Sequence, residues 1–277
     1  MQLETKPMPS LQQIRESLHI SHSQINQYML CPLKFYFQYV QGIQPDYVPS
    51  ALVFGSVIHD VLATFYMSIL STHEIPRKEE LTESFAIYWD MRRKRDDEVK
   101  FKAKESWDKL LDLGTKMMEA YYNWLSEKGM PKHEDIIAVE QPFQVSIGDM
   151  DLVGVVDLIL RDSKDENLFH LIDHKTAARR YDDFKIASDS QMTCYKFLLD
   201  SSGYLPDGAE MTLNYDVLLK TKEPKVERYS TVRDGKAISR FLKIARAILH
   251  AMDEQVFYPI PSWVCGDCPF KKLCEKW

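Results

Sequence analysis

Residues 151–176, DLVGVVDLILRDSKDENLFHLIDHKT, are the stretch that decides the fold. Two runs rich in Val, Ile and Leu carry the aspartates Asp157 and Asp173, and a polar turn separates them. Such runs are typical of β-strands. If the two strands pair, Asp157 and Asp173 can face each other. Asp173 and Lys175 then point to the same side, because residues two apart in a strand share a face.

Two carboxylates beside one ammonium group suit a hard divalent cation and an activated water. Mg²⁺ prefers oxygen ligands and keeps several of its waters. A lysine placed like Lys175 can orient or deprotonate an attacking water, or stabilise a phosphate that gains negative charge. The competing interpretation is a solvated salt bridge at a strand edge, which is the more frequent meaning of an isolated D-x-K triplet.

Two further motifs accompany these aspartates. Gln191 and Tyr195 are four residues apart and share one face of a predicted helix. Gly55-Ser-Val-Ile-His59 places an imidazole on an otherwise apolar helix, where a core or capping histidine is the usual interpretation. The ordered series G-x3-H, G-x2-D, D-x-K-T and Q-x3-Y is far more specific than any one of its members.

Apolar periodicity predicts the remaining elements. Helices are expected over 24–40 with a break at Pro32, and over 54–70, 81–95, 106–128, 182–200 and 237–255. Strands are expected over 136–147, 151–160, 168–173, 211–219 and 225–231, with a hairpin turn at Gly148-Asp149. We therefore expect an α/β fold with a flexible segment 1–20 and a single domain 21–277, comprising a helical part 55–130, a sheet core 136–231 and a Cys-rich tail 258–277.

Composition excludes several classes of protein. Hydrophobic residues make up 45% and charged residues 27% of the chain, as in an ordinary globular protein. Lys and Arg number 35 against 41 Asp and Glu, so a net charge of −6 argues against a general polyanion binder. No GxxxxGK[ST] phosphate loop is present, so the chain is not itself a P-loop motor. Without an apolar run of about 18 residues or a secretory leader, we expect a cytoplasmic chain with no membrane partner.

The five cysteines point to a metal site. Their odd number and the missing leader argue against a disulfide framework. Cys265-x2-Cys268-x5-Cys274 brings three thiols close together, and Cys31 or Cys194 would supply a fourth. Four thiolates hold either zinc or a cubane iron–sulfur cluster. A reduced tail without a ligand is the third alternative.

The ordered motifs resemble those of the PD-(D/E)XK nuclease superfamily, in its RecB/AddB-type iron–sulfur exonuclease branch, and are similar to CRISPR-associated iron–sulfur exonucleases. The resemblance covers most of the chain, from Ser21 to Cys274. It implies a restriction-endonuclease-like core, a central mixed sheet flanked by helices. It also implies that Mg²⁺ or Mn²⁺ is bound by His59, Asp157, Asp173 and the backbone carbonyl of His174, that Lys175 is catalytic, and that Gln191 and Tyr195 position the DNA strand or the water. Asp173 stands where Glu is frequent, and His174 where an aromatic residue is more usual.

The same resemblance extends to the cysteines. The segment Ser21-x-Ser23-x4-Tyr28-x2-Cys31-Pro32 resembles the one that carries the first cluster cysteine in AddB-type nucleases. It implies a structural 4Fe–4S cluster that joins the two chain ends, bound by Cys31, Cys265, Cys268 and Cys274. Cys194 would then be a small buried hydrophobic residue.

By this resemblance the chain is a Mg²⁺- or Mn²⁺-dependent deoxyribonuclease, an exonuclease that prefers single-stranded ends, in DNA recombination and repair or in CRISPR or phage DNA processing. DNA is the expected partner, with Arg179 and Arg180 as candidate contacts. A helicase or another DNA-processing subunit is a candidate second partner, because the chain has no motor motif. The alternatives are a non-catalytic iron–sulfur DNA-binding subunit of a helicase–nuclease complex and a zinc-stapled interaction domain.

Overall fold

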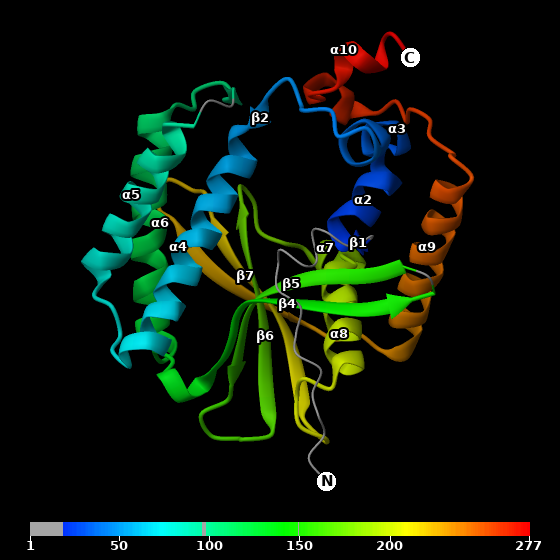
Figure 1. The fold of residues 1–277 in the computed structure, drawn as a ribbon. Helices are drawn as coiled ribbons and strands as arrows, with labels where there is room; N and C mark the ends of the chain where they lie inside the picture. The colour runs from blue at the N-terminus through cyan, green and yellow to red at the C-terminus, as the bar shows by residue number, and fades with distance from the viewer. Residues whose placement is uncertain (1–18, 96–97, 149) are drawn as a thin grey trace.

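The computed structural model describes residues 19–95, 98–148 and 150–277, and a mixed β-sheet forms its centre (Figure 1). The strands follow the order β1-β5-β6-β7-β8, with β4 paired to the other edge of β5. β1 runs parallel to β5 and β6 runs parallel to β7, whereas the remaining neighbours are antiparallel. The strands are β1 (His19–Ser21), β4 (Ile136–Ile147), β5 (Met150–Arg161), β6 (Leu168–Ala177), β7 (Glu210–Leu219) and β8 (Lys225–Thr231). Two short strands, β2 (Val48–Pro49) and β3 (Val99–Lys100), pair separately.

Helices cover both faces of the sheet, with α4, α5 and α6 on one side and α2, α8 and α9 on the other (Figure 1). The α-helices are α2 (His22–Leu30), α3 (Pro32–Phe35), α4 (Ser50–Thr72), α5 (Lys78–Arg93), α6 (Trp107–Lys128), α7 (Asp183–Ser188), α8 (Gln191–Ser202), α9 (Gly235–Asp253) and α10 (Lys271–Cys274). Short helical turns are η1 (Tyr36–Val40), η2 (His133–Asp135) and η3 (Trp263–Asp267). The predicted α/β fold with a mixed sheet flanked by helices is confirmed.

Two apolar cores lie on opposite faces of the sheet because strand side chains alternate. Leu158 packs with α4–α6, whereas its neighbour Ile159 packs with the helices of the other face. The same alternation separates Ile172 from Leu171. Strands that are covered on both faces have nearly continuous apolar sequences. The apolar runs in residues 151–176 therefore identify the central strands of the sheet.

The predicted helix over 24–40 breaks at Pro32 as expected. Ser21 caps α2, since its side chain accepts a hydrogen bond from the Gln24 amide at 3.2 Å. Pro32 then stands at the first position of α3, where its missing N–H leaves no donor unsatisfied.

Two expectations differ from the structure. The helix expected over 182–200 is two helices, because the chain is extended at Asp189. Arg233, which is 6% exposed, donates to the carbonyls of Ile186 at 2.6 Å and Asp189 at 3.0 Å, so the carbonyls freed at this break have a partner. In addition, the end of the segment expected to be flexible forms β1, where Ile20 is buried; residues 1–18 lie outside the described residues, as does Asp149 of the expected hairpin turn.

Helix α4 has the length and hydropathy of a membrane span, and it is the one helix in the described ranges that does. Half of its apolar window is buried inside the molecule, and a core helix meets the same criterion. The burial follows from its packing against α5, α6 and the sheet, so the helix is weak evidence for a membrane.

Candidate active site

β5 and β6 separate at the two predicted aspartates. Their ladder begins with Arg161 opposite Phe169 and ends with Leu158 opposite Ile172. The next pair in this register would be Asp157 opposite Asp173, and there the two strands are no longer paired. We call this point the fork. There, the backbone N–H of His174 donates to Asp157 Oδ2 at 2.7 Å instead of to a strand carbonyl. The fork therefore brings two buried carboxylates, 7% and 0% exposed, to the same place, as the sequence predicted.

Lys175 and Gln191 hold the two oxygens of Asp173. Lys175 Nζ lies 2.6 Å from Asp173 Oδ2, and Gln191 Nε2 donates to Asp173 Oδ1 at 2.9 Å. Gln191 Nε2 also donates to the Tyr195 hydroxyl at 2.7 Å, so the predicted Q-x3-Y pair reaches the aspartate as a unit. Helix α8 approaches β5 closely here because residue 154 is glycine: a Cβ on Gly154 would lie 2.7 Å from Leu198 Cδ1.

His59 of α4 meets Asp157 from the opposite face of the sheet. Its Nδ1 atom lies 3.3 Å from Asp157 Oδ2. A third potential ligand, Glu140 of β4, completes a set whose ligand atoms all lie within 4.8 Å of one another. Asp173 is outside this set, so the structure groups His59 and Asp157 with Glu140 and groups Asp173 with Lys175.

Sequence reasoning missed Glu140. It lies on β4 between the residues that pair with β5, and its φ of +47° is in the left-handed region that non-glycine residues rarely adopt. Such backbone strain costs about 1–3 kcal/mol and clusters at functional sites. The available signal was an acid inside an apolar strand, Val139-Glu140-Gln141-Pro142, on the neighbour of the strand that carries Asp157.

The carboxylates of the site are crowded by negative charge. Burial, followed by the repulsion of Asp157, raises the pKa of Glu140 to about 7. Burial also raises the pKa of Asp173 to about 7 and outweighs the attraction of Lys175. For Asp157, burial acts upward, but contact with His59 and the charges nearby hold its pKa below the usual value. A divalent cation would relieve this crowding.

The donor set fits Mg²⁺ or Mn²⁺, which prefer carboxylate oxygens, and Mn²⁺ also accepts imidazole. The Lys175 ammonium lies 2.6 Å from the buried Asp173 Oδ2. The fit of a metal therefore rests on the donor set and on the crowding of its carboxylates.

His174 connects the fork to the helical layer. Its Nε2 atom lies 3.0 Å from the Tyr121 hydroxyl, which lies 2.6 Å from the Tyr66 hydroxyl. Burial lowers the pKa of His174 to about 4, so the ring is neutral at pH 7 and carries one N–H. If Tyr121 donates to Nε2, the Nδ1–H faces Asp157 Oδ2 at 3.8 Å. The unusual histidine in the D-x-K motif thus belongs to a buried polar chain.

Four of the five cysteines surround one cavity. Cys31, Cys265, Cys268 and Cys274 line a cavity of 260 Å³ together with Leu33, Phe37 and Phe270. Here α3 and the C-terminal segment lie side by side (Figure 1), joined by a hydrogen bond from Leu33 N to Tyr258 O at 3.0 Å. Burial, and then the neighbouring thiols, raise the pKa of Cys274.

Cys194 is not among these cavity residues. It is fully buried in α8, and burial raises the pKa of its thiol.

The family comparison agrees with the motifs. The model of the PD-(D/E)XK nuclease superfamily matches residues 19–275, so the chain belongs to this superfamily. Membership makes it a nuclease with DNA as its substrate class, in a superfamily that uses divalent metals. None of the curated proteins matches the chain.

Solved structures share the fold. A candidate exonuclease from Eubacterium rectale aligns over 100% of this chain and 93% of its own, with a TM-score of 0.58 and 9% identity. The structure of SSO0001 aligns over 92% of this chain and 95% of its own, with 14% identity and a TM-score of 0.36, too low to carry an argument. At such identities the first likeness supports the fold alone.

Proposed function

We propose that this chain is a Mg²⁺- or Mn²⁺-dependent DNA exonuclease that prefers single-stranded ends, with residues 21–277 as one nuclease domain. The observation that carries the proposal is the fork, where Asp157, Asp173 and Lys175 meet and Gln191 binds Asp173. A non-catalytic DNA-binding subunit would not need this buried group of acids beside a lysine.

Each side chain of the fork has a proposed task. Burial lowers the pKa of Lys175, but Asp173 and Asp157 raise it above its usual value, so an ammonium faces the site and stabilises charge that develops on the phosphate. Gln191 and Tyr195 hold Asp173 in place. The proposed metal ligands are His59, Glu140, Asp157, Asp173 and the His174 carbonyl. A divalent cation bound there supplies charge neutralisation at the phosphate and a more acidic bound water.

End-labelled single- and double-stranded DNA with Mg²⁺ or Mn²⁺ tests the proposal. Asp173→Ala and Lys175→Ala should each abolish cleavage and leave thermal unfolding cooperative. Lys164→Ala and Glu166→Gln, in the exposed turn between β5 and β6, are the matched controls and should cleave like the wild type. Cleavage that survives in both fork variants would contradict the proposed site.

We also propose that the chain belongs to the RecB/AddB-type iron–sulfur branch, with a 4Fe–4S cluster on Cys31, Cys265, Cys268 and Cys274. The cavity lined by all four thiols supports this. The same four thiols could instead hold tetrahedral zinc, with Zn–S bonds of about 2.3 Å.

Metal analysis distinguishes a 4Fe–4S cluster from zinc at the cysteine site. Anaerobically purified protein should be brown, with about four iron and four sulfide per chain. Stoichiometric zinc without sulfide would establish the zinc alternative. The proposed setting is cytoplasmic DNA recombination and repair or CRISPR or phage DNA processing, with a helicase or another DNA-processing subunit as partner.

A further inference from the structure

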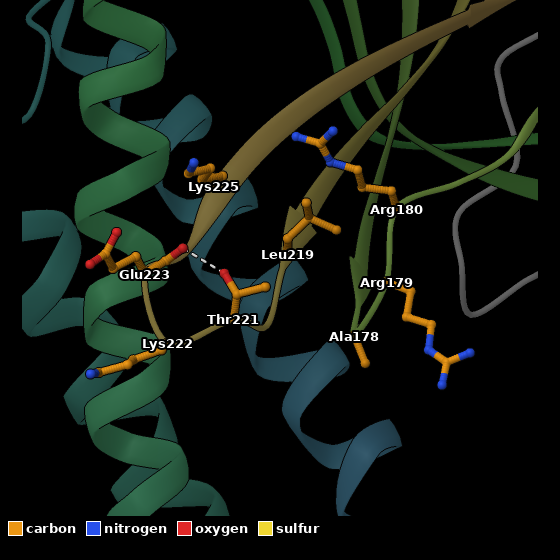
Figure 2. A pocket seen from close by; sticks show the side chains of 8 residues that line it. All are labelled: Ala178, Arg179, Arg180, Leu219, Thr221, Lys222, Glu223 and Lys225. Carbon is orange, nitrogen blue, oxygen red and sulfur yellow. Dashed lines mark hydrogen bonds between the residues drawn. The ribbon is translucent and has the colours of Figure 1, made fainter.

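A pocket of 370 Å³ lies where two segments leave the same end of the sheet (Figure 2). β6 ends at Ala177 and β7 at Leu219, and the parallel register pairs these two residues. The Lys220 amide donates to the Ala177 carbonyl at 2.7 Å. Residues 178–180 and the tip of the β7–β8 hairpin therefore emerge side by side, and together they line the pocket.

Half of the residues that line this pocket are basic. Arg179 and Arg180 come from the segment after β6, and Lys222 and Lys225 come from the facing hairpin, with Glu223 as the acid (Figure 2). All four basic residues are exposed. In a chain of net charge −6, such a local excess of positive charge indicates a site for an anion.

Little in the protein neutralises these cations. Arg180 forms an ion pair with Glu227 at 2.5 Å, whereas Arg179, Lys222 and Lys225 have no ion pair within the described residues.

The pocket is close to the fork. Arg179 follows Lys175 by four residues, and strand residues rise about 3.3 Å each, so the two lie at most about 13 Å apart along the chain. Successive nucleotides of one strand rise about 3.4 Å along a duplex axis, and a single strand is more extended. A DNA strand with its cleaved bond at Lys175 therefore places a phosphate at the pocket within about four nucleotides.

The opening continues beyond this pocket. A second pocket of 660 Å³ shares Lys222, Glu223 and Lys225 with the first and extends over α6, where Lys116, Glu119 and Glu127 also line it. Acidic and basic side chains balance in this second pocket, so the excess of positive charge belongs to the first one.

We propose that Arg179, Arg180, Lys222 and Lys225 form a phosphate-binding subsite that holds the DNA backbone within about four nucleotides of the cleaved bond. The proposal rests on the proposed nuclease function and adds a substrate-binding track to it. The subsite acts by electrostatic contact and positions the strand without reading its bases.

Salt-dependent DNA binding tests the subsite in an Asp173→Asn background. Fluorescence anisotropy with a long single-stranded oligonucleotide is compared for this background and for its Arg179→Ala/Lys222→Ala/Lys225→Ala derivative. Three lost phosphate contacts should weaken binding and reduce the slope of log K against log salt by about 2, since each contact on a single strand contributes about 0.7.

A matched triple variant on α9, Lys236→Ala/Arg240→Ala/Lys243→Ala, removes the same charge from exposed positions and should leave the slope unchanged. An oligonucleotide too short to reach the pocket should bind both triple variants equally. An unchanged slope in the pocket variant, or equal losses in both, overturns the proposal.

Cleavage by the otherwise wild-type chain is measured in parallel. If the pocket governs DNA binding but the wild type cleaves no DNA, the nuclease proposal fails and the subsite stands. If the wild type cleaves DNA but binding ignores the pocket, the subsite fails and the nuclease proposal stands.

Discussion

Glu140 illustrates how a single residue can join a site through an unusual backbone conformation. Its φ of +47° puts a carboxylate beside His59 and Asp157, at a position where a regular strand would continue its ladder with β5. The strain persists because β4 is paired with β5 on both sides of it. We infer that the strained backbone is kept because it places the Glu140 carboxylate beside His59 and Asp157.

Replacing this carboxylate should weaken metal binding. Glu140→Gln removes one negative charge and one oxygen ligand, and we expect Mn²⁺ affinity to fall by at least about 10-fold, since losing even an outer partner of a ligand costs about 10- to 100-fold. Calorimetric titration of the purified protein with Mn²⁺ measures this directly. Glu166→Gln, an exposed change of the same kind, should leave the affinity unchanged, and an unchanged affinity in Glu140→Gln would exclude the ligand role.

The same carboxyl groups predict a pH dependence. Glu140 and Asp173 have pKa values of about 7 in the metal-free fold, above the values of about 4 in an unfolded chain. Their stabilising contribution is therefore complete below about pH 4 and is lost as the pH rises through about 7.

Since a cation needs the ionised forms, metal binding should release protons at pH 6 and release fewer at pH 8.5. Affinity should accordingly rise over this range. Calorimetry in buffers of different ionisation enthalpy counts the released protons. The absence of proton release at pH 6 would contradict the raised pKa values of Glu140 and Asp173.

At the scale of elements, local pattern predicted most of the fold. β4 and β8 occupy the residues expected, because their apolar periodicity is clear and turns flank them. The facing of Asp157 and Asp173 was also predictable, since it follows from antiparallel pairing across one turn.

The features that the sequence pattern could not predict depend on residues far away in the sequence. The break between α7 and α8 has its freed carbonyls satisfied by Arg233, which follows β8, and no local signal announces that contact. Glu140 was missed because its place depends on the register of β4 and on a left-handed φ. Neither is encoded in residues next to it.

Helix α6 also reaches the fork, through Tyr121 and its contact with His174. Tyr121→Phe removes the hydroxyl between Tyr66 and His174, leaving two buried polar groups without their partner. We expect a loss of about 1–3 kcal/mol in unfolding free energy and weaker Mn²⁺ binding, because His174 lies against Asp157. Tyr122→Phe, whose hydroxyl has no hydrogen bond within the described residues, is the control on the same helix. A loss of stability without any change in Mn²⁺ affinity would mean that the hydrogen bonds between Tyr66, Tyr121 and His174 have a structural role alone.

At the scale of the whole molecule, α2 connects the cysteine cavity with the fork. Its first residue, His22, contacts Ser190 through Nε2 at 3.0 Å, immediately before Gln191. Its C-terminal cap is Cys31, at the cavity. Nine helical residues span about 13 Å, so one rigid helix joins the two sites.

Cys31→Ala should therefore act on both sites. We expect loss of iron and a fall in unfolding temperature of at least about 5 °C, since about 2–4 °C corresponds to each kcal/mol in a chain of this size. Because α2 ends at Cys31 and begins beside Ser190, DNA cleavage should also weaken, although no fork residue has changed. Cys194→Ala is the contrasting variant: it lies in α8 away from the cavity, so iron content should persist with a small loss of core packing. Iron analysis, thermal unfolding and cleavage rates on the same preparations separate these outcomes. If iron survives Cys31→Ala but is lost in Cys194→Ala, the ligand that completes the cluster lies beside the fork, and the link through α2 is wrong.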